Sequence, residues 1–312
     1  MKVIRNLADF PVLPQAVVTS GTFDGVHIGH QKIIERLLEV TRATNGQSVV
    51  ITYWPHPRLV LDAANQTPLH LLSTIEERIE QLGTYDIDYL LIIPFTKEFA
   101  SLTSEQYIQQ ILLAAIHTKV LVIGYDHRFG KNREGDFKYL QKHAPALGFR
   151  VEEIPAQDID HIAVSSTRIR KALETGNIVN ATTYLGHYYS LTGKVVPGRQ
   201  LGRTIGYPTA NIVVTDHHKL IPAQGIYAVQ VKINQQLRGG MLSIGINPTV
   251  GGTTQTIEVH IFDFQADIYD QVITLYFVAY IRAEQKFDSL AELTEQLHQD
   301  QVTALALLNQ QS

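Results

Sequence analysis

Short apolar runs alternate with segments of helical period over the first half of this 312-residue chain. The run QAVVTS (15–20) precedes residues 30–44, whose apolar side chains share one helical face: Ile33, Ile34, Leu37 and Leu38. Further apolar runs occur at 48–54, 89–95, 119–125 and 149–156. Strands and helices in regular turn predict a parallel sheet with helices on both faces.

Polar residues before the helical segments support this alternation. Ser73 with Glu76, and Thr103 with Gln106, have the spacing of a capping box and predict where two helices begin. Two more helices are expected, near 137–145 and over 166–175.

The pattern changes in the second half, where glycine-punctuated strands continue to about residue 282. These strands are expected at 190–196, 209–214, 225–233, 239–246, 256–264 and 271–281. Strands with turn signals and no intervening helices predict an antiparallel barrel or sandwich, which a terminal helix over 289–308 would cover on one side. The change falls between 180 and 187, so we predict two domains, 1–183 and 184–312.

Composition narrows the function classes. With 45% hydrophobic and 18% charged residues the chain is ordinary globular protein, and its net charge of −4, with scattered lysines and arginines, argues against a nucleic-acid partner. The absence of cysteine excludes disulfides and thiol catalysis. No signal peptide or membrane-length apolar run occurs, so we expect a cytoplasmic protein without a membrane partner.

The stretch GTFDGVHIGH follows the first apolar run, where a strand is expected to turn into a helix. Gly21 and Gly25 would let the backbone approach a ligand, and the amides near Gly29 and His30 would face an anion at the helix start. His27 lies one helical turn from His30, so both side chains could reach one phosphate. The alternative is a capped, hydrogen-bonded turn. The stretch lacks a Walker lysine and the G-x-G-x-x-G of dinucleotide folds.

Three further stretches are expected on the same edge of the sheet. YWPHP (53–57) follows the second strand, GYDHRFGKNREGD (124–136) follows the fourth, and SSTRIRKAL (165–173) opens a helix. Each has a simpler explanation: two prolines make a stiff turn, and Ser-Ser-Thr is an ordinary helix cap followed by solvated arginines.

Together these four motifs resemble the adenylyltransferase half of bacterial bifunctional riboflavin kinase/FAD synthetases. The resemblance implies a Rossmann-like domain in which His27 and His30 are catalytic and Pro57 contacts flavin. It also implies a nucleotide-binding set: Gly21, Phe23, Asp24, Gly25, Gly29, Asp126, Ser166, Thr167 and Arg170. One departure is His127, which stands where the family usually has phenylalanine. Another is His187, where arginine is common.

A second dense stretch, GKVVPGRQLGRTIGYPTANI, covers 193–212. It is not a P-loop, because no lysine follows a glycine at the required offset. It holds a glycine-rich loop, Gly198 to Gly206, followed by Thr209 and Asn211, whose side chains would share one face of an extended segment. Hydroxyl and amide oxygens suit a hard cation such as Mg²⁺, although a plain turn explains the same residues.

Glu258 alternates with apolar residues in IEVHIFDF and could orient or deprotonate a hydroxyl group. Its simpler explanation is the solvated face of a strand, and the residues alone favour that explanation.

The second half, however, resembles the flavokinase module, and the two resemblances together cover about residues 15–300. This implies a β-barrel kinase with Glu258 as base and Mg²⁺ held by Thr209 and Asn211. It further implies that Gly198, Gly202 and Arg203 bind ATP and that Arg282 binds flavin. The implied substrates and products are ATP, riboflavin, FMN and FAD, handled by a monomer or weak homo-oligomer.

Two other functions remain open at this point. One is a nucleotidyltransferase with another phosphate acceptor, in which the barrel only binds a ligand. The other is a protein that stores or senses flavin, which would leave both phosphate loops without a role.

Overall fold

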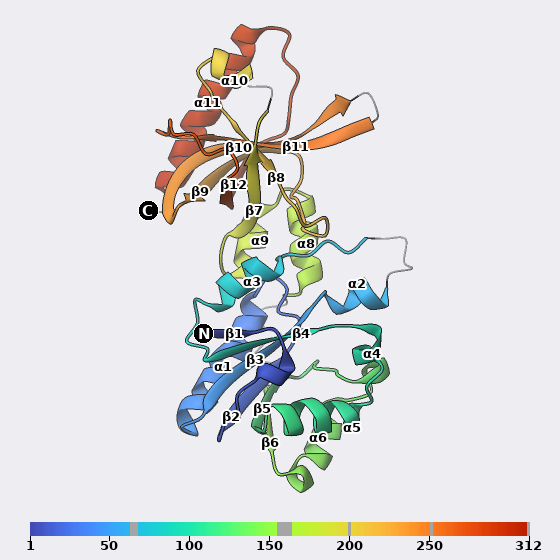
Figure 1. Ribbon diagram of the computed structural model, residues 1–312. Coiled ribbons are helices and arrows are strands. Elements are labelled where there is room, and N and C mark those ends of the chain that lie inside the picture. Colours follow the sequence, from blue (N-terminus) through green and yellow to red (C-terminus); the bar gives the residue numbers. More distant parts are fainter. Residues whose placement is uncertain (63–67, 155–163, 199–200, 250–251, 311–312) are drawn as a thin grey trace. The chain divides into compact units, whose positions relative to one another are not determined.

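Six parallel strands form the sheet of the first half of the chain (Figure 1). Their order across the sheet is β1 (Lys2–Ile4), β4 (Tyr89–Pro94), β3 (Gln47–Trp54), β2 (Ala16–Ser20), β5 (Thr118–Gly124) and β6 (Arg150–Ile154). Every neighbouring pair is parallel, as the alternation predicts. The computed structural model describes residues 1–62, 68–154, 164–198, 201–249 and 252–310.

Apolar side chains cover both faces of this sheet. On one face Val17 and Val50 pack with α1 (Ile28–Ala43) and α3 (Ile75–Leu82). On the other face Val18 and Val49 pack with the π-helix Ile108–Ala115 and with α6 (Phe137–His143). Since successive side chains of a strand point to opposite faces, a fully buried strand such as β2 feeds both cores. The prediction of helices on both faces is confirmed.

Of the two helix starts predicted from capping boxes, one occurs at the predicted residues and the other is shifted by one residue. Thr103 and Gln106 form the expected capping box of α5 (Ser104–Tyr107), which continues into the π-helix. The box before α3, however, is Thr74 with Glu77, one residue after the predicted Ser73 and Glu76. Both pairs have the same spacing, so the sequence pattern alone does not choose between them.

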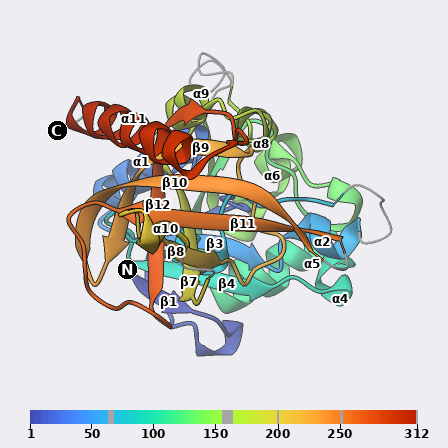
Figure 2. The same cartoon turned by 90° about the horizontal axis from the view of Figure 1, so that it is seen from above.

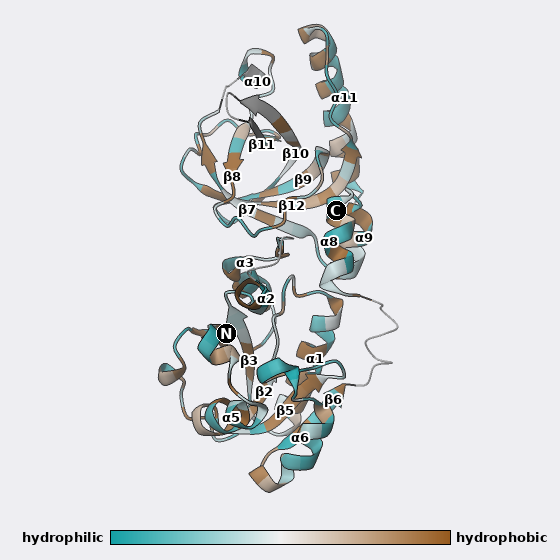
Figure 3. Cartoon of the chain, turned by 90° about the vertical axis from the view of Figure 1, so that its right-hand side faces the viewer, coloured by the Kyte–Doolittle hydropathy of each residue, from teal (hydrophilic) through white to brown (hydrophobic). Residues whose placement is uncertain are grey.

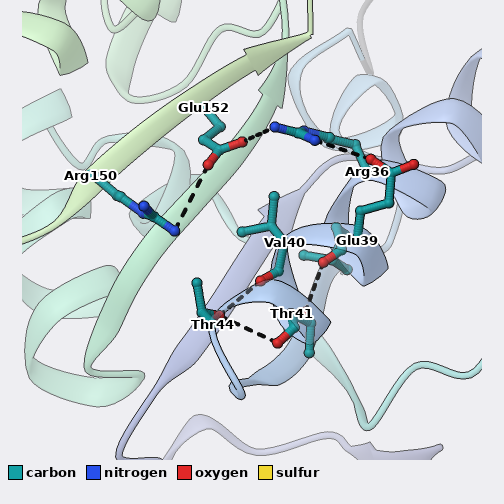
Figure 4. A network of polar contacts seen from close by, with 8 residues as sticks. Arg36, Glu39, Val40, Thr41, Thr44, Arg150 and Glu152 are labelled. Carbon is teal, nitrogen blue, oxygen red and sulfur yellow. Dashed lines mark hydrogen bonds and ion pairs between the residues drawn. The ribbon is translucent and has the colours of Figure 1, made fainter.

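An ion-pair network joins the C-terminal part of α1 to the edge strand β6 (Figure 4). Arg36 donates to Glu152 over 2.6 Å and to Glu39 over 3.0 Å, while Arg150 lies 3.9 Å from Glu152. At the end of the helix the Thr44 hydroxyl donates to the backbone carbonyls of Val40 and Thr41. Because most of these side chains are exposed to solvent, their ion pairs add little stability.

The second half forms a closed antiparallel barrel, which decides between the predicted barrel and sandwich. Its strands follow the order β10 (Gln236–Thr249), β11 (Gly252–Ile261), β8 (Ala210–Val213), β7 (Tyr189–Val196), β12 (Val272–Arg282) and β9 (Gly225–Ile233). The predicted terminal helix, α11 (Leu290–Asn309), packs across β9, β10 and β12 (Figure 2). Hydrophobic and hydrophilic residues interchange along α11 (Figure 3), as expected of a helix with one buried side.

Packing divides the chain into two units. Unit 1 comprises 1–69 and 74–165, and unit 2 comprises 70–73 and 166–312. The helices α8 (Ser166–Glu174) and α9 (Ile178–Leu185) therefore group with the barrel, because α8 packs on α9 and α9 packs on β7 and β12. The sequence pattern changes later, at 180–187, because these two helices continue the helical period.

The remaining short elements are the 3-10 turns Leu7–Asp9, Lys131–Arg133 and Pro145–Leu147, and the helices α2 (Pro57–Leu61), α4 (Lys97–Ala100) and α10 (Leu201–Thr204). Within the described ranges, no helix is long and apolar enough to cross a membrane.

Candidate active sites

The strand order of unit 1 reverses at β2, which lies between β3 and β5. Ligands of such sheets bind outside the carboxyl ends of the strands at this reversal. Residues 21–30, which we call the nucleotide loop after the role predicted for them, leave β2 there and enter α1. The turn GYDHRFG leaves β5 on the same edge, with Asp126 exposed. The first and third predicted motifs thus follow neighbouring strands.

The nucleotide loop has an unusual backbone. Gly25 has φ +78°, and the non-glycine residues Phe23 and Val26 have φ of +48° and +39°. Left-handed backbone at a phenylalanine and a valine costs free energy, so the surrounding structure must hold it. Asp24, in the middle of this turn, is buried, and a Cβ at Gly21 would press on the Phe23 ring at 3.2 Å. The loop is therefore closely packed.

The two histidines of the loop lie against each other at the start of α1. Their rings stack with centroids 3.7 Å apart and an interplanar angle of 15°. His27 is the N-cap, and its Nδ1 accepts a hydrogen bond of 3.4 Å from the backbone N–H of His30. The backbone N–H of His30, one of the amides expected to face an anion, thus already has a partner in His27, and anion binding at this helix start stays a prediction. Gly29 is buried in the first turn of α1.

The surroundings of His30 disfavour a charge on its ring. Burial, the neighbouring His27 ring and the charge of Arg78 lower the pKa of His30 well below its usual value. Nδ1 of His27 is a hydrogen-bond acceptor, which in the neutral ring leaves the proton on Nε2. Imidazole N–H groups at a helix N-terminus can donate hydrogen bonds to an anion.

The stretch YWPHP ends β3 and begins α2, where Pro57 is the first helical residue and is half-buried. His56 caps this helix by accepting from the Arg58 N–H over 3.2 Å. Part of this stretch therefore has a structural role: proline makes the turn stiff, and His56 caps the helix that follows.

His127, the departure from the family pattern, packs beside Phe129, with ring centroids 5.8 Å apart. Burial, helped by the positive charge of Arg133, lowers its pKa to about 4. The imidazole is therefore neutral at physiological pH and fills the place of an aromatic ring.

The SSTRIR stretch contains three predicted site residues, which lie on α8, and α8 belongs to unit 2. Ser166 and Thr167 open the helix, and Arg170 donates from Nε to the carbonyl of His70. Their predicted contact with nucleotide phosphates stays a prediction. His187, the second departure, follows the end of α9, with its Nδ1 3.0 Å from the carbonyl of Tyr188.

The barrel brings together the three predicted residues of the kinase site. Glu258 on β11 is the register partner of Asn211 on β8, so their side chains share a face. The hydroxyl of Thr209 donates to the Glu258 carboxylate over 3.2 Å. All three are half-buried. A carboxylate from β11, an amide from β8 and the hydroxyl of the residue before β8 thus converge.

Two glycines of the glycine-rich stretch beside them let neighbouring groups approach the backbone closely. A Cβ at Gly198 would overlap the Asn211 amide, and one at Gly202 would overlap the carbonyl of Tyr207. Part of the stretch is the short helix α10 instead of loop, with Arg203 exposed in its last turn. A cavity of about 420 Å³ opens next to it and is lined by residues that include Arg203 and Thr209.

Arg282, predicted to bind flavin, has a strong partner within the protein. Its Nε and Nη2 donate to the two carboxylate oxygens of Asp300 on α11, over 2.8 and 2.6 Å. Asp300 is only 1% exposed. The pair joins β12 to α11, and a role for Arg282 toward flavin stays a prediction.

A buried arginine linked to the nucleotide loop through Thr52 was not expected from the sequence. Arg78 lies on α3 at the i+3 position from Ile75 and is followed by Leu82 at i+7, on the helical face that packs into the core. A charged residue at a position that periodicity reserves for apolar side chains is the signal that could have found it.

Comparisons with known proteins agree over the whole chain. A family model described as FAD synthetase matches residues 10–168, and one described as riboflavin kinase matches residues 185–308. The bifunctional riboflavin kinase/FMN adenylyltransferase of Escherichia coli (strain K12) is 38% identical over 307 residues, 97% of each chain. The protein of the same name from Haemophilus influenzae is 36% identical over 311 residues, 99% of this chain and 100% of that one.

The fold also matches a solved structure. A crystal structure of a Streptococcus pneumoniae protein called macrolide-efflux protein aligns with a TM-score of 0.84 and 33% identity. The match covers 97% of this chain and 98% of that one.

Proposed function

Because this chain belongs to the family of bifunctional riboflavin kinases and FMN adenylyltransferases, we propose which of its residues carry each reaction. The chain phosphorylates riboflavin with ATP to give FMN. It then transfers AMP from a second ATP to FMN, giving FAD and pyrophosphate. We assign the first reaction to the barrel and the second to the parallel sheet, in line with the residues that each family model matches.

In the kinase reaction, Glu258 accepts the proton of the ribityl 5′-hydroxyl as this oxygen attacks the γ-phosphate of ATP. The observation that supports this role is the convergence of Glu258 with Thr209 and Asn211. Phosphoryl transfer depends mainly on positioning and electrostatics, so a carboxylate fixed by a hydrogen bond is well suited to orient the hydroxyl. Gly198, Gly202 and Arg203 would cover the phosphates.

The oxygens of Thr209 and Asn211 fit a magnesium ion. Mg²⁺ prefers oxygen ligands and is usually shared between one or two protein groups and substrate phosphates. When bound, Mg²⁺ would draw charge from the β- and γ-phosphates.

In the adenylyl transfer, His27 and His30 stabilise charge on the ATP phosphates. The phosphate of FMN is already ionised and attacks without a base. Imidazole N–H groups are suited to donate hydrogen bonds to phosphate oxygens, and the start of α1 adds a positive dipole end. Asp126, Ser166, Thr167 and Arg170 are further candidates for this nucleotide, and Pro57 and Arg282 for flavin. We expect a cytoplasmic monomer or weak homo-oligomer that acts on small molecules and not on nucleic acid.

Chromatography of the flavins formed from riboflavin, ATP and Mg²⁺ tests this division. The parent chain should form FMN and then FAD. Replacing both His27 and His30 by alanine should lower FAD formation by at least roughly 10²-fold, since one lost transition-state contact is worth about 3 kcal/mol. Riboflavin phosphorylation should persist, and the exposed His217→Ala should change neither rate. FAD formation at the parental rate in the double variant would remove the two histidines from the mechanism.

A further inference from the structure

Arg78 is a fully buried cation in unit 1, with 0% of its surface exposed. Its Nη1 donates to the Thr52 hydroxyl over 3.1 Å and to the Tyr53 carbonyl over 3.4 Å. Nε and Nη2 have no hydrogen-bond partner within the described part of the chain. Its carbon Cζ lies 5.7 Å from the centre of the Trp54 ring. A guanidinium remains charged at any physiological pH, so this arrangement costs free energy that packing alone does not explain.

The position of Arg78 connects it to the nucleotide loop. The same Thr52 hydroxyl that accepts from Arg78 donates to the carbonyl of Thr22, over 3.1 Å. Asp24, buried in the loop, favours the charged form of Arg78. Arg78 therefore acts on the loop through a hydrogen-bond chain at its first residues and through an electrostatic attraction at its turn.

The charge of Arg78 also acts on His30. Burial lowers the pKa of His30 most, and the His27 ring and the charge of Arg78 lower it further. A fixed positive charge near His30 disfavours a second charge on its ring. It also raises the potential at the place where substrate phosphates would bind.

We propose that Arg78 is a positioning residue for FMN adenylylation, whose buried guanidinium holds the nucleotide loop in place. It is not a catalytic residue, because a side chain with no exposed surface does not touch substrate. The proposal rests on the assignment of adenylyl transfer to unit 1. The alternative is that Arg78 only fills space between α3 and β3.

Three substitutions separate charge from packing. Arg78→Met keeps the stem and removes the charge, Arg78→Gln keeps a hydrogen-bond donor without charge, and Arg78→Lys keeps the charge. Adenylylation turnover should fall at least tenfold in the Met and Gln variants and less than about threefold in the Lys variant. KM for ATP and FMN should change little, and riboflavin phosphorylation by the same preparations should stay at the parental rate. The exposed Arg42→Met is the matched control and should change neither reaction.

The pH dependence of kcat for adenylylation separates the two roles further, because a change in packing alone would not shift it. Without the buried charge the pKa of His30 rises, so the acid limb of kcat for adenylylation should move to higher pH in the Met and Gln variants. It should stay at the parental position in the Lys variant. Should the Met chain fail to fold, the comparison of Gln with Lys decides.

Three results would overturn the proposal. Parental turnover and pH profile in a folded Met or Gln variant would show that the charge is not used. A Lys variant no better than Gln would show that shape matters and charge does not. A parent chain that forms FMN but no FAD would overturn the assignment of the reaction together with the proposal, and this result is obtained before any variant is measured.

Discussion

At the residue scale, burial is the main influence on two histidines of unit 1, His30 and His127. Burial is the largest cause of the lowered pKa of both His30 and His127, and nearby positive charge adds to it. Buried imidazoles of this kind can act as neutral donors or as aromatic packing groups, but not as cations at neutral pH.

His127 gives a pH prediction for unit 1. Between pH 6.5 and about 4 the unfolded chain binds a proton at this residue that the folded chain excludes, so stability falls as the pH falls through this window. Because the ring is only half-buried, we expect a loss of about 1–2 kcal/mol from this residue between pH 7.5 and pH 5. In His127→Phe this part of the loss should disappear.

Urea unfolding followed by the fluorescence of Trp54, the single tryptophan of the chain, measures this in unit 1. The control is the parent at both pH values. An equal loss of stability on acidification in parent and variant would contradict the shift.

At this scale the sequence predicts which residue types are functional and which side chains share a face of a strand. It does not predict which residues contact each other across the barrel. The period of two in a strand places Thr209 and Asn211 on one side. It does not show that Glu258 lies opposite Asn211. This register depends on how β11 pairs with β8, a strand far from it in the sequence. The bidentate partner of Arg282, Asp300 on the last helix, was likewise beyond any local pattern.

At the element scale, a four-residue segment from the first half of the chain is built into unit 2. Leu71 forms a parallel bridge with Lys219, and its N–H donates to the carbonyl of His218 over 2.6 Å. Lys219, only 3% exposed, donates to the carbonyl of Leu72 over 2.7 Å and lies 4.2 Å from the centre of the Tyr189 ring. Residues 70–73 therefore contribute to the stability of the barrel unit.

Lys219→Met should destabilise unit 2. The thioether keeps the apolar stem but leaves the Leu72 carbonyl without its donor, which costs about 1–3 kcal/mol. Lys171→Met, on the exposed side of α8, is the matched control and should stay within about 0.5 kcal/mol of the parent. Differential scanning calorimetry measures both, and equal melting of the two variants would refute a stabilising role for the segment.

The long, strongly patterned elements were predictable, and the short ones were not. All strands with apolar runs and the helices with clear periods occur where the sequence places them. The edge strand β1 was missed because its three residues are largely exposed and carry no alternation. The link between 70–73 and Lys219 joins positions far apart in the chain, so no local signal announces it.

At the scale of the whole molecule, two cores support two kinds of phosphate chemistry on one chain. The parallel sheet offers a helix start with two stacked histidines, and the barrel offers a carboxylate beside a hydroxyl and an amide. The domain order was predictable from the change of pattern. The packing of α8 and α9 with the barrel was not, because a helical period does not say which sheet a helix covers.

The kinase activity of Glu258→Gln tests the central claim of two separate sites most directly. Glutamine keeps the size and hydrogen-bonding shape but cannot accept a proton, so riboflavin phosphorylation should fall by roughly 10²- to 10⁴-fold. Supplied FMN should still become FAD at the parental rate, and the melting temperature should stay close to that of the parent. Phosphorylation of riboflavin at a near-parental rate in the folded variant, at saturating substrates, would contradict the assignment.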